Sequence, residues 1–168
     1  MRSEKKPSLA KELMNKYDFK MAKGLGQNFL VDESILNEIV ASADLDENDF
    51  VLEIGPGIGT MTQAIAKQVK KVVAVEIDKR LMPILNVALF GYDNISVINE
   101  DVLKVDLPKL LSDNFGDQRA KVVANLPYYI TTPIIMALIE GKLNLKSITI
   151  MIQKEEAERI AASPGGKV

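Results

Sequence analysis

The stretch FVLEIGPGIGTMTQAIAKQVKKVVAVE, residues 50–76, decides the fold of this 168-residue chain. It reads as a buried strand (FVLEI, 50–54), a glycine-rich loop, a helix (61–68) and a second buried strand (KVVAVE, 71–76). Continuous Val and Ile runs that are separated by a helix are typical of parallel strands covered on both faces. We therefore predict an α/β protein whose ligand site lies at the carboxyl ends of its strands.

The same pattern continues upstream and downstream of this stretch. A short helix is expected at Ser8–Tyr17, and Asp32 can cap a second helix that packs on the sheet. The apolar face of that second helix consists of Ile35, Leu36, Ile39, Val40 and Ala43. The expected downstream elements are a turn followed by a helix from about Pro83 to Leu89, the strands Ile95–Ile98, Ala120–Ala124 and Ser147–Ile152, and a final helix from Lys154 to Ala162.

One further helix is expected between the last two strands. It is delimited by Thr132 as N-cap, Pro133 at the first helical position and Gly141 past the end. Its inward residues are predicted to be Ile134, Ile135, Leu138 and Ile139.

The composition excludes several kinds of chemistry. Cysteine and histidine are both absent, so disulfides, the usual zinc and transition-metal ligands and thiolate nucleophiles are excluded, and we expect no metal site. Zinc deaminases and base methyltransferases that attack through a cysteine are excluded with them. No apolar run approaches the roughly 20 residues of a membrane span, and the first residues lack the apolar core of a secretion signal. We expect a cytoplasmic protein with no membrane partner.

The glycine-rich loop predicts a ligand site. Gly55, Gly57 and Gly59 allow a tight turn and a close approach of the backbone to a ligand, although such turns also pack helices closely against sheets. The spacing differs from the G-x-G-x-x-G of dinucleotide sites. Glu53 precedes the loop, and its carboxylate would repel a pyrophosphate and attract a sulfonium or an ammonium group. This pattern favours S-adenosylmethionine over NAD.

Three acidic positions follow the second and third strands. Glu76 can accept hydrogen bonds from two ribose hydroxyls, and Ile77 follows it in the cofactor site; the alternative for Glu76 is an exposed helix cap, a role that Asp78 could fill equally well. Asp101 can accept from an adenine amine, with the Val102 N–H available to a ring nitrogen. Glu100 competes with Asp101 for this role, and an ordinary acidic loop remains an alternative.

The segment at the end of the fourth strand predicts a binding site for an amine. It consists of Asn125, Leu126, Pro127 and Tyr128. The Asn125 side-chain oxygen and the Leu126 carbonyl can both accept from one exocyclic amine. Pro127 stiffens the turn, and Tyr128 or the neighbouring Tyr129 offers a ring for stacking on a base. Alternatively, the two tyrosines pack as hydrophobic side chains beneath the following helix.

The N-terminal segment is basic although the whole chain carries a net charge of −2. Residues 1–30 have a local net charge of +4, which comes from Arg2, Lys5, Lys6, Lys11, Lys16, Lys20 and Lys23 against Glu4, Glu12 and Asp18. This segment is either a solvated amphipathic start or an arm that contacts phosphates. We divide the chain into a basic segment with a cofactor-closing loop, 1–31, and a methyltransferase core, 32–168.

Motifs along the chain resemble those of the KsgA-type ribosomal RNA adenine N6,N6-dimethyltransferases, to which the erythromycin-resistance rRNA methyltransferases are related. The matching motifs are GLGQNFLVD (24–32), LEIGPGIGTMT (52–62), VVAVEIDKRL (72–81), INEDVLKVDL (98–107), VVANLPYYITTPII (122–135) and MIQKEEAERIAASPG (151–165). NLPYYITTP is more similar to the housekeeping dimethyltransferases than to the resistance enzymes. The resemblance implies a Rossmann-like class I methyltransferase fold that lacks here the last strands and the helical C-terminal domain of the family.

The resemblance also implies a cofactor pocket and a substrate. Gln27, Asn28 and Leu30 would join Gly55, Glu76, Asp101 and Asn125 around S-adenosylmethionine. The substrate would be two adjacent adenosines near the 3′ end of small-subunit rRNA, each of which receives two methyl groups. Two other functions stay open: a small-molecule N-methyltransferase, and an rRNA-binding assembly factor of the small subunit whose methylation is incidental.

Overall fold

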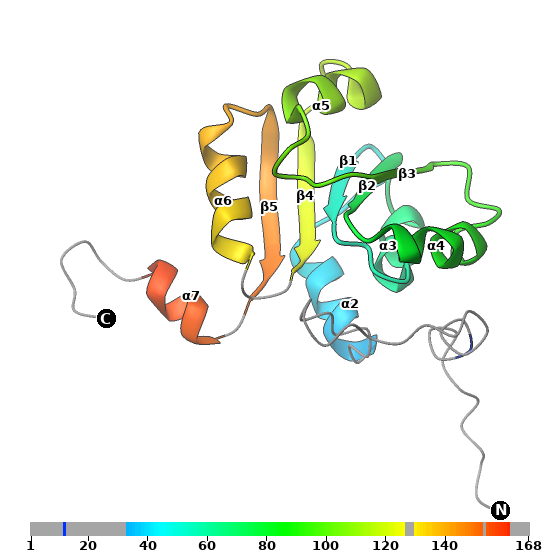
Figure 1. Cartoon of the computed structure of the whole chain (residues 1–168), viewed down its shortest axis with the longest axis horizontal. Coiled ribbons are helices and arrows are strands. Elements are labelled where there is room, and N and C mark those ends of the chain that lie inside the picture. Colours follow the sequence, from blue (N-terminus) through cyan, green and yellow to red (C-terminus); the bar gives the residue numbers. More distant parts are fainter. Residues whose placement is uncertain (1–11, 13–32, 127–129, 153, 162–168) are drawn as a thin grey trace, which may run out of the picture.

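The computed structural model describes residues 12, 33–126, 130–152 and 154–161. Five parallel strands form one sheet in the order β3-β2-β1-β4-β5 (Figure 1). The strands are β1 (Phe50–Ile54), β2 (Lys71–Glu76), β3 (Ile95–Asn99), β4 (Ala120–Asn125) and β5 (Leu145–Met151). The strand order reverses between β1 and β4, which makes the carboxyl ends of these two strands the topological switch point.

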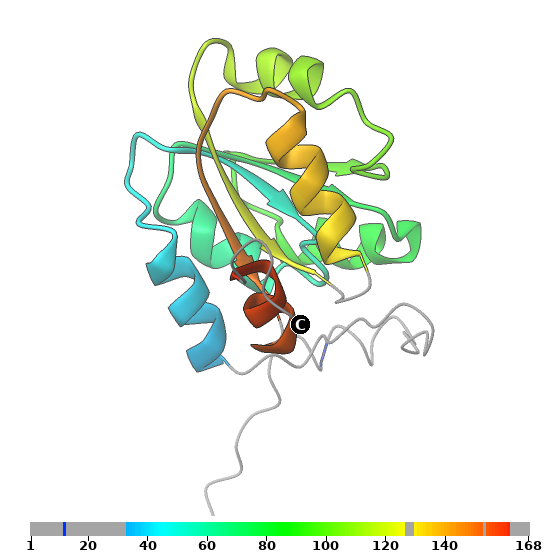
Figure 2. The same cartoon turned by 90° about the vertical axis from the view of Figure 1, so that its left-hand side faces the viewer.

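Helices cover both faces of the sheet, as the sequence predicted. The helices are α2 (Glu33–Ser42), α3 (Thr60–Ala66), α4 (Met82–Ala88), α5 (Leu107–Phe115), α6 (Thr131–Glu140), α7 (Lys154–Ala161) and the 3₁₀-helix η1 (Lys79–Leu81). Figure 2 shows α2 on one side of the sheet and α6 on the other. The predicted class, an α/β fold with a parallel sheet, is confirmed.

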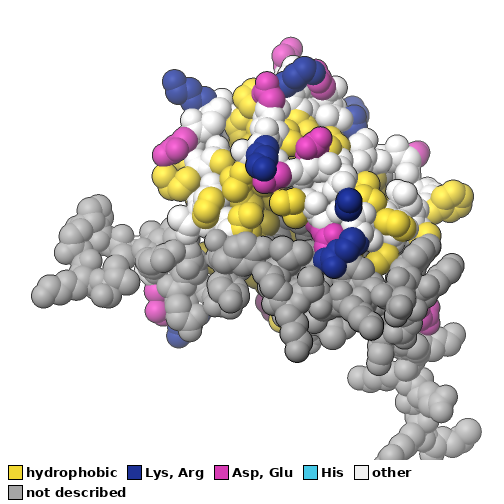
Figure 3. All heavy atoms as spheres, in the orientation of Figure 1, with side chains coloured by type: hydrophobic (Ala, Val, Ile, Leu, Met, Phe, Trp, Pro, Cys, Tyr) yellow, Lys and Arg dark blue, Asp and Glu magenta, His cyan; other side chains and the backbone are white. Residues whose placement is uncertain are grey.

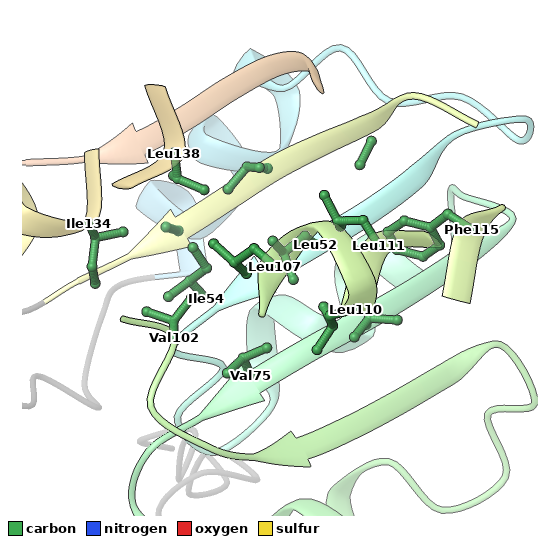
Figure 4. Close-up of a cluster of buried hydrophobic side chains, with 14 residues drawn as sticks. Leu52, Ile54, Val75, Val102, Leu107, Leu110, Leu111, Phe115, Ile134 and Leu138 are labelled. Carbon is green, nitrogen blue, oxygen red and sulfur yellow. The ribbon is translucent and has the colours of Figure 1, made fainter. Parts of the chain in front are cut away.

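Alternate residues of the strands build two cores. On one face, Leu52 and Ile54 of β1 meet apolar residues of α5 and α6 (Figure 4). On the other face, Val51 of β1 packs among residues of α2 and α3. Successive side chains of a strand point to opposite faces, so Glu53 lies on the face of Val51, toward α2 and α3.

A buried ion pair lies at the amino ends of the strands. The Lys121 ammonium of β4 lies 2.9 Å from Oδ2 of Asp49, with both side chains less than a tenth exposed. Lys121 also donates to the carbonyl of Asp44. The pair fastens the segment before β1 to the neighbouring strand β4.

Helix α5 is absent from the sequence predictions. Asp106 caps it by accepting from the Lys109 N–H at 3.0 Å, Pro108 lies in its first turn, and Gly116 follows it with a positive φ of 59°. These are ordinary signals of a helix start and stop. Leu110 and Leu111 of α5 belong to the core that Figure 4 shows.

Helix α6 corrects three predicted details. Its N-cap is Ile130, so Thr132 lies inside the helix and Pro133 in its first turn. Ile134 and Leu138 are buried as predicted, whereas Ile139 is 64% exposed. A helix that covers one edge of a sheet buries only a narrow stripe, and Ile139 lies beyond that stripe.

The other helices agree more closely with the sequence. In α2, the residues Leu36, Ile39 and Val40 are buried as predicted, but Ile35 is exposed. Pro83 lies in the first turn of α4 after the predicted turn, which is η1. The predicted helix at Ser8–Tyr17 lies outside the described residues except for Glu12. Among the described residues, no helix is long and apolar enough to span a bilayer.

Candidate functional site

Parallel register brings the predicted site residues to one edge of the sheet. Ile54 at the end of β1 pairs with Val75 on one side and with Ala124 on the other. Glu76 at the end of β2 pairs with Asn99 of β3. The loops that follow β1, β2, β3 and β4 therefore begin side by side, where α/β proteins bind their ligands (Figure 1).

The glycine loop between β1 and α3 uses conformations that favour glycine. Gly55, Gly57 and Gly59 have φ angles of 73°, 60° and 89°. A Cβ at Gly59 would lie 3.2 Å from the side chains of Leu85 and Leu89, so this glycine permits close packing of α4. A Cβ at Gly55 would lie 3.4 Å from the Asn125 carbonyl oxygen, so Gly55 brings the loop close to the end of β4. The interpretation that the loop packs a helix closely is confirmed at Gly59, and the ligand site at the loop stays a prediction.

Glu76 is buried and already oriented. Its Oε2 accepts from the Gly57 N–H at 3.1 Å and its Oε1 from the Asp78 N–H at 3.0 Å. Burial raises the pKa of Glu76, while these backbone hydrogen bonds act in the opposite direction. The alternative of an exposed helix cap is wrong for Glu76, because its residue is only 3% exposed and Asp78 caps η1 instead.

Asp78 and Arg80 extend this arrangement, and the sequence analysis assigned Arg80 no role. The Arg80 guanidinium donates to both oxygens of Asp78, at 2.9 Å from Nε to Oδ1 and 2.6 Å from Nη2 to Oδ2. The side chain of Asp78 is 6% exposed and that of Arg80 46%. Arg80 therefore fixes Asp78, whose N–H fixes Glu76. Glu76, Asp78 and Arg80 alternate along the sequence EIDKR, and this spacing is the sequence pattern from which the arrangement could have been predicted.

Glu53 is the least expected residue of the site. It is 0% exposed, and neither carboxyl oxygen has a hydrogen-bond partner among the described residues. The buried hydroxyl of Thr62 likewise has none there. Burial raises the pKa of Glu53 to about 8, the nearby Thr62 hydroxyl lowers it, and the negative charge of Glu76 raises it further. Glu53 is therefore mainly a neutral acid at pH 7 rather than the carboxylate that the sequence suggested.

The segment after β3 carries the predicted adenine-binding residues. Asp101 is half-buried, and its Oδ1 accepts from the Leu103 N–H at 2.9 Å, which makes it a turn cap as well as a candidate acceptor. Val102 is buried in the core, which leaves its backbone as the part that could meet a ligand (Figure 4). Glu100 is exposed. Ile77 is 56% exposed at the same edge, where an apolar side chain could lie against a base.

The structure describes only part of the candidate amine-binding site. Asn125 is the last residue of β4 and is half-buried. Leu126 follows it and packs against the core. The remaining predicted residues lie outside the described residues, namely Gln27, Asn28, Leu30, Pro127 and Tyr128. Within the described ranges, no cluster of three or more acidic side chains could hold a metal ion.

Comparison with known proteins agrees with this geometry. Residues 18–168 match the family described as ribosomal RNA adenine dimethylase. The chain is 56% identical over 161 residues to ribosomal RNA small subunit methyltransferase A of Alkaliphilus oremlandii, covering 96% of this chain and 56% of that protein. It is 54% identical to the protein of the same name from Bacillus pumilus, again covering 96% of this chain and 56% of the relative. The chain thus spans about half the length of these curated relatives.

Solved structures give the same answer at lower identity. A dimethyladenosine transferase from Plasmodium falciparum superposes with a TM-score of 0.68 at 33% identity, covering 80% of this chain and 46% of that one. The 23S rRNA methyltransferase ErmE superposes with a TM-score of 0.68 at 33% identity, covering 78% of this chain and 50% of that one. The strand order, the glycine loop and the family match over most of the chain lead to one conclusion: the chain belongs to the ribosomal RNA adenine dimethylase family.

Proposed function

We propose that the chain is the cofactor-binding part of an enzyme that transfers methyl groups from S-adenosylmethionine to adenine N6 of two adjacent adenosines near the 3′ end of small-subunit rRNA. The single observation that carries the proposal is the oriented carboxylate of Glu76, held by the Gly57 and Asp78 amides beside the glycine loop. Members of this family are S-adenosylmethionine-dependent methyltransferases, in agreement with the cofactor that the sequence predicted.

The described residues fit this cofactor in charge and in shape. Oxygen atoms of Glu76 remain able to accept from ribose hydroxyls, since a carboxylate has about four acceptor positions and the two amides use two of them. The glycines leave room for close approach to the backbone. Glu53 and Glu76 lie on the same face of the sheet, at the ends of neighbouring strands beside the glycine loop.

The base side of the site would be formed by the end of β4. When bound, S-adenosylmethionine supplies an electrophilic methyl group. Adenine N6 is a poor nucleophile because its lone pair is delocalised into the ring. Asn125 and the Leu126 carbonyl would hold the amine so that the lone pair points along the line of displacement, which accelerates the transfer by positioning. Tyr128 or Tyr129 would stack on the flipped-out base.

No general base is needed at this site. An amide such as that of Asn125 cannot accept the proton under these conditions, and the amine carries its extra proton only after transfer has made it cationic. That proton can then leave to water. Asn125 is therefore assigned to orientation alone.

The rRNA substrate is favoured over a free amine by the names of the relatives. On the face that Figure 3 shows, basic side chains of the described residues are interspersed with acidic ones, so no continuous basic surface is visible there. We assign the phosphate contacts to the basic segment before residue 31, and we place the protein in the cytoplasm with its ribosomal substrate.

The test is to identify the product. The full-length enzyme that contains this chain is incubated with S-adenosylmethionine carrying a labelled methyl group and with immature small ribosomal subunits, and the digested rRNA is analysed by mass spectrometry. Labelled N6,N6-dimethyladenosine is expected, with much less of it from a Glu76→Ala variant at a limiting cofactor concentration. Methylation of free small amines in preference to the rRNA would support a small-molecule enzyme. Binding to the subunits that persists without cofactor and without product would support an assembly factor.

A further inference from the structure

Glu53 has no function in the mechanism above, although burying an ionisable group without partners is costly. It is the fourth residue of β1 and comes two residues before Gly55. Its register partners are Ala74 of β2 and Val123 of β4, neither of which offers a side-chain donor. Its side chain is 0% exposed.

The backbone amides of the nearby loop are engaged elsewhere. The Gly55 N–H donates to the Val75 carbonyl at 3.0 Å, and the Gly59 N–H donates to the Pro56 carbonyl at 3.0 Å. The Gly57 N–H donates to Glu76. Thus none of the three glycine amides stabilises a carboxylate at Glu53, which has no donor within the part of the chain that the structure describes.

The charged surroundings of Glu53 are acidic. Among the described residues, the charge that acts on it comes from Glu76 of β2, and α3 contributes the neutral Thr62. The buried residues of α2 on this face are Leu36, Ile39 and Val40, which are apolar. With a pKa of about 8, Glu53 holds its proton at neutral pH. A positive charge placed nearby would favour the ionised form instead.

S-adenosylmethionine and the by-product left after transfer differ in such a charge. The cofactor carries a sulfonium, while S-adenosylhomocysteine carries a neutral thioether in its place. Both keep the same ribose, adenine and amino-acid groups. The ammonium charge is common to both, so a residue that responds to the sulfonium charge can tell the two apart.

We propose that Glu53 is the specificity-determining residue that separates cofactor from by-product, because it loses its proton to water when the sulfonium binds and keeps it when the thioether binds. The inference rests on the proposed function, since it assumes the S-adenosylmethionine site. It predicts that cofactor affinity rises with pH relative to by-product affinity. The loss of the methyl group then returns a proton to Glu53 and weakens the hold on the by-product.

The first experiment counts protons. The chain is titrated calorimetrically at pH 7 with each ligand in buffers of different ionisation enthalpy. Binding of S-adenosylmethionine should release up to about one proton more than binding of S-adenosylhomocysteine, the limit for one linked group. Glu53→Gln should abolish this difference. Asp113→Asn, a matched carboxyl-to-amide change on the exposed part of α5, should preserve it.

The second experiment measures the affinity ratio of the two ligands from pH 6 to pH 8. The ratio should rise with pH in the wild-type chain, by at most about tenfold per pH unit, and should be flat in Glu53→Gln. Equal proton release for the two ligands, or a ratio that does not change with pH, would overturn the inference. Both are measured on the wild-type chain, so they decide the matter even where Glu53→Gln does not fold. Absence of any S-adenosylmethionine binding would instead overturn the proposed function.

Discussion

The Gly57 N–H donates a 3.1 Å hydrogen bond to Oε2 of Glu76, and this bond joins the glycine loop after β1 to the end of β2. The second oxygen of Glu76 accepts from the Asp78 N–H, and Arg80 in turn holds the Asp78 carboxylate. The carboxyl group of Glu76, the proposed ribose acceptor, is thereby held in one orientation. Such preorganisation raises affinity, because less conformational entropy is lost on binding.

Glu76→Ala should weaken S-adenosylmethionine binding by roughly 1.5–3 kcal/mol, since hydrogen bonds to a buried charged group are lost. Isothermal titration calorimetry of the purified chain measures the change. Glu100→Ala is the control, because Glu100 is an exposed carboxylate at the same edge of the sheet. Equal affinity of the Glu76→Ala variant and the wild type would remove Glu76 from the site.

The buried Glu53 predicts how stability depends on pH. Its pKa is raised from 4.5 to about 8 by folding, so between these values the folded state binds more protons than the unfolded state. The contribution of Glu53 to stability is therefore fully present below pH 4.5 and is lost as pH rises to about 8. One pKa unit corresponds to about 1.4 kcal/mol, so the loss should exceed about 2 kcal/mol.

Urea denaturation from pH 5 to pH 9 tests this prediction. The wild type should lose stability with rising pH relative to Glu53→Gln, in which the titrating group is absent. Parallel pH profiles for the two proteins would show that Glu53 does not titrate in this range.

The ion pair between Asp49 and Lys121 should matter for stability and not for binding. Asp49→Ala leaves the Lys121 ammonium buried without its carboxylate, which costs about 3–5 kcal/mol. Asp113→Ala breaks the exposed pair with Lys109, whose side chains are 58% and 70% exposed, and should cost less than about 1 kcal/mol. Chemical denaturation of both variants gives the comparison. Similar losses in the two variants would contradict the assigned burial.

The last strand of the described sheet predicts self-association. β5 is an edge strand in the described residues, Ile148 on it is 36% exposed, and Ile139 and Met136 on α6 beside it are also exposed. An apolar edge with free backbone groups pairs readily with another chain. Ile148→Lys should therefore reduce association in light scattering, whereas Val87→Lys on α4 at the opposite end of the sheet should not. A wild-type chain that stays monomeric at all concentrations would refute this.

The fold could be predicted well because its signals are local. Val and Ile runs such as KVVAVE specify buried parallel strands, and the glycine loop marks the turn into α3. Helix α5 was missed although Asp106, Pro108 and Gly116 carry the signals for its start and stop. The exposure of Ile139 could not be predicted, because it depends on how much of α6 the sheet edge covers.

The positions of the candidate site residues at the sheet edge could be predicted, whereas their protonation and hydrogen-bond partners could not. The strand ends correctly placed Glu53, Glu76 and Asn125 at one edge, since parallel strands align their carboxyl ends. Glu53 is fully buried and has no hydrogen-bond donor among the described residues. This outcome depends on the directions of the loop amides, which cannot be read from a sequence. The link from Arg80 through Asp78 to Glu76 likewise depends on the geometry of η1.

The central claim is that Asn125 orients a nucleobase amine for methyl transfer. The most direct measurement is single-turnover methyl transfer to immature small ribosomal subunits by the full-length enzyme and by its Asn125→Ala variant, with S-adenosylmethionine affinity determined in parallel. Loss of one positioning contact can lower a rate by about a hundredfold. The account predicts such a loss with a much smaller change in affinity. A near-wild-type rate in Asn125→Ala would contradict it.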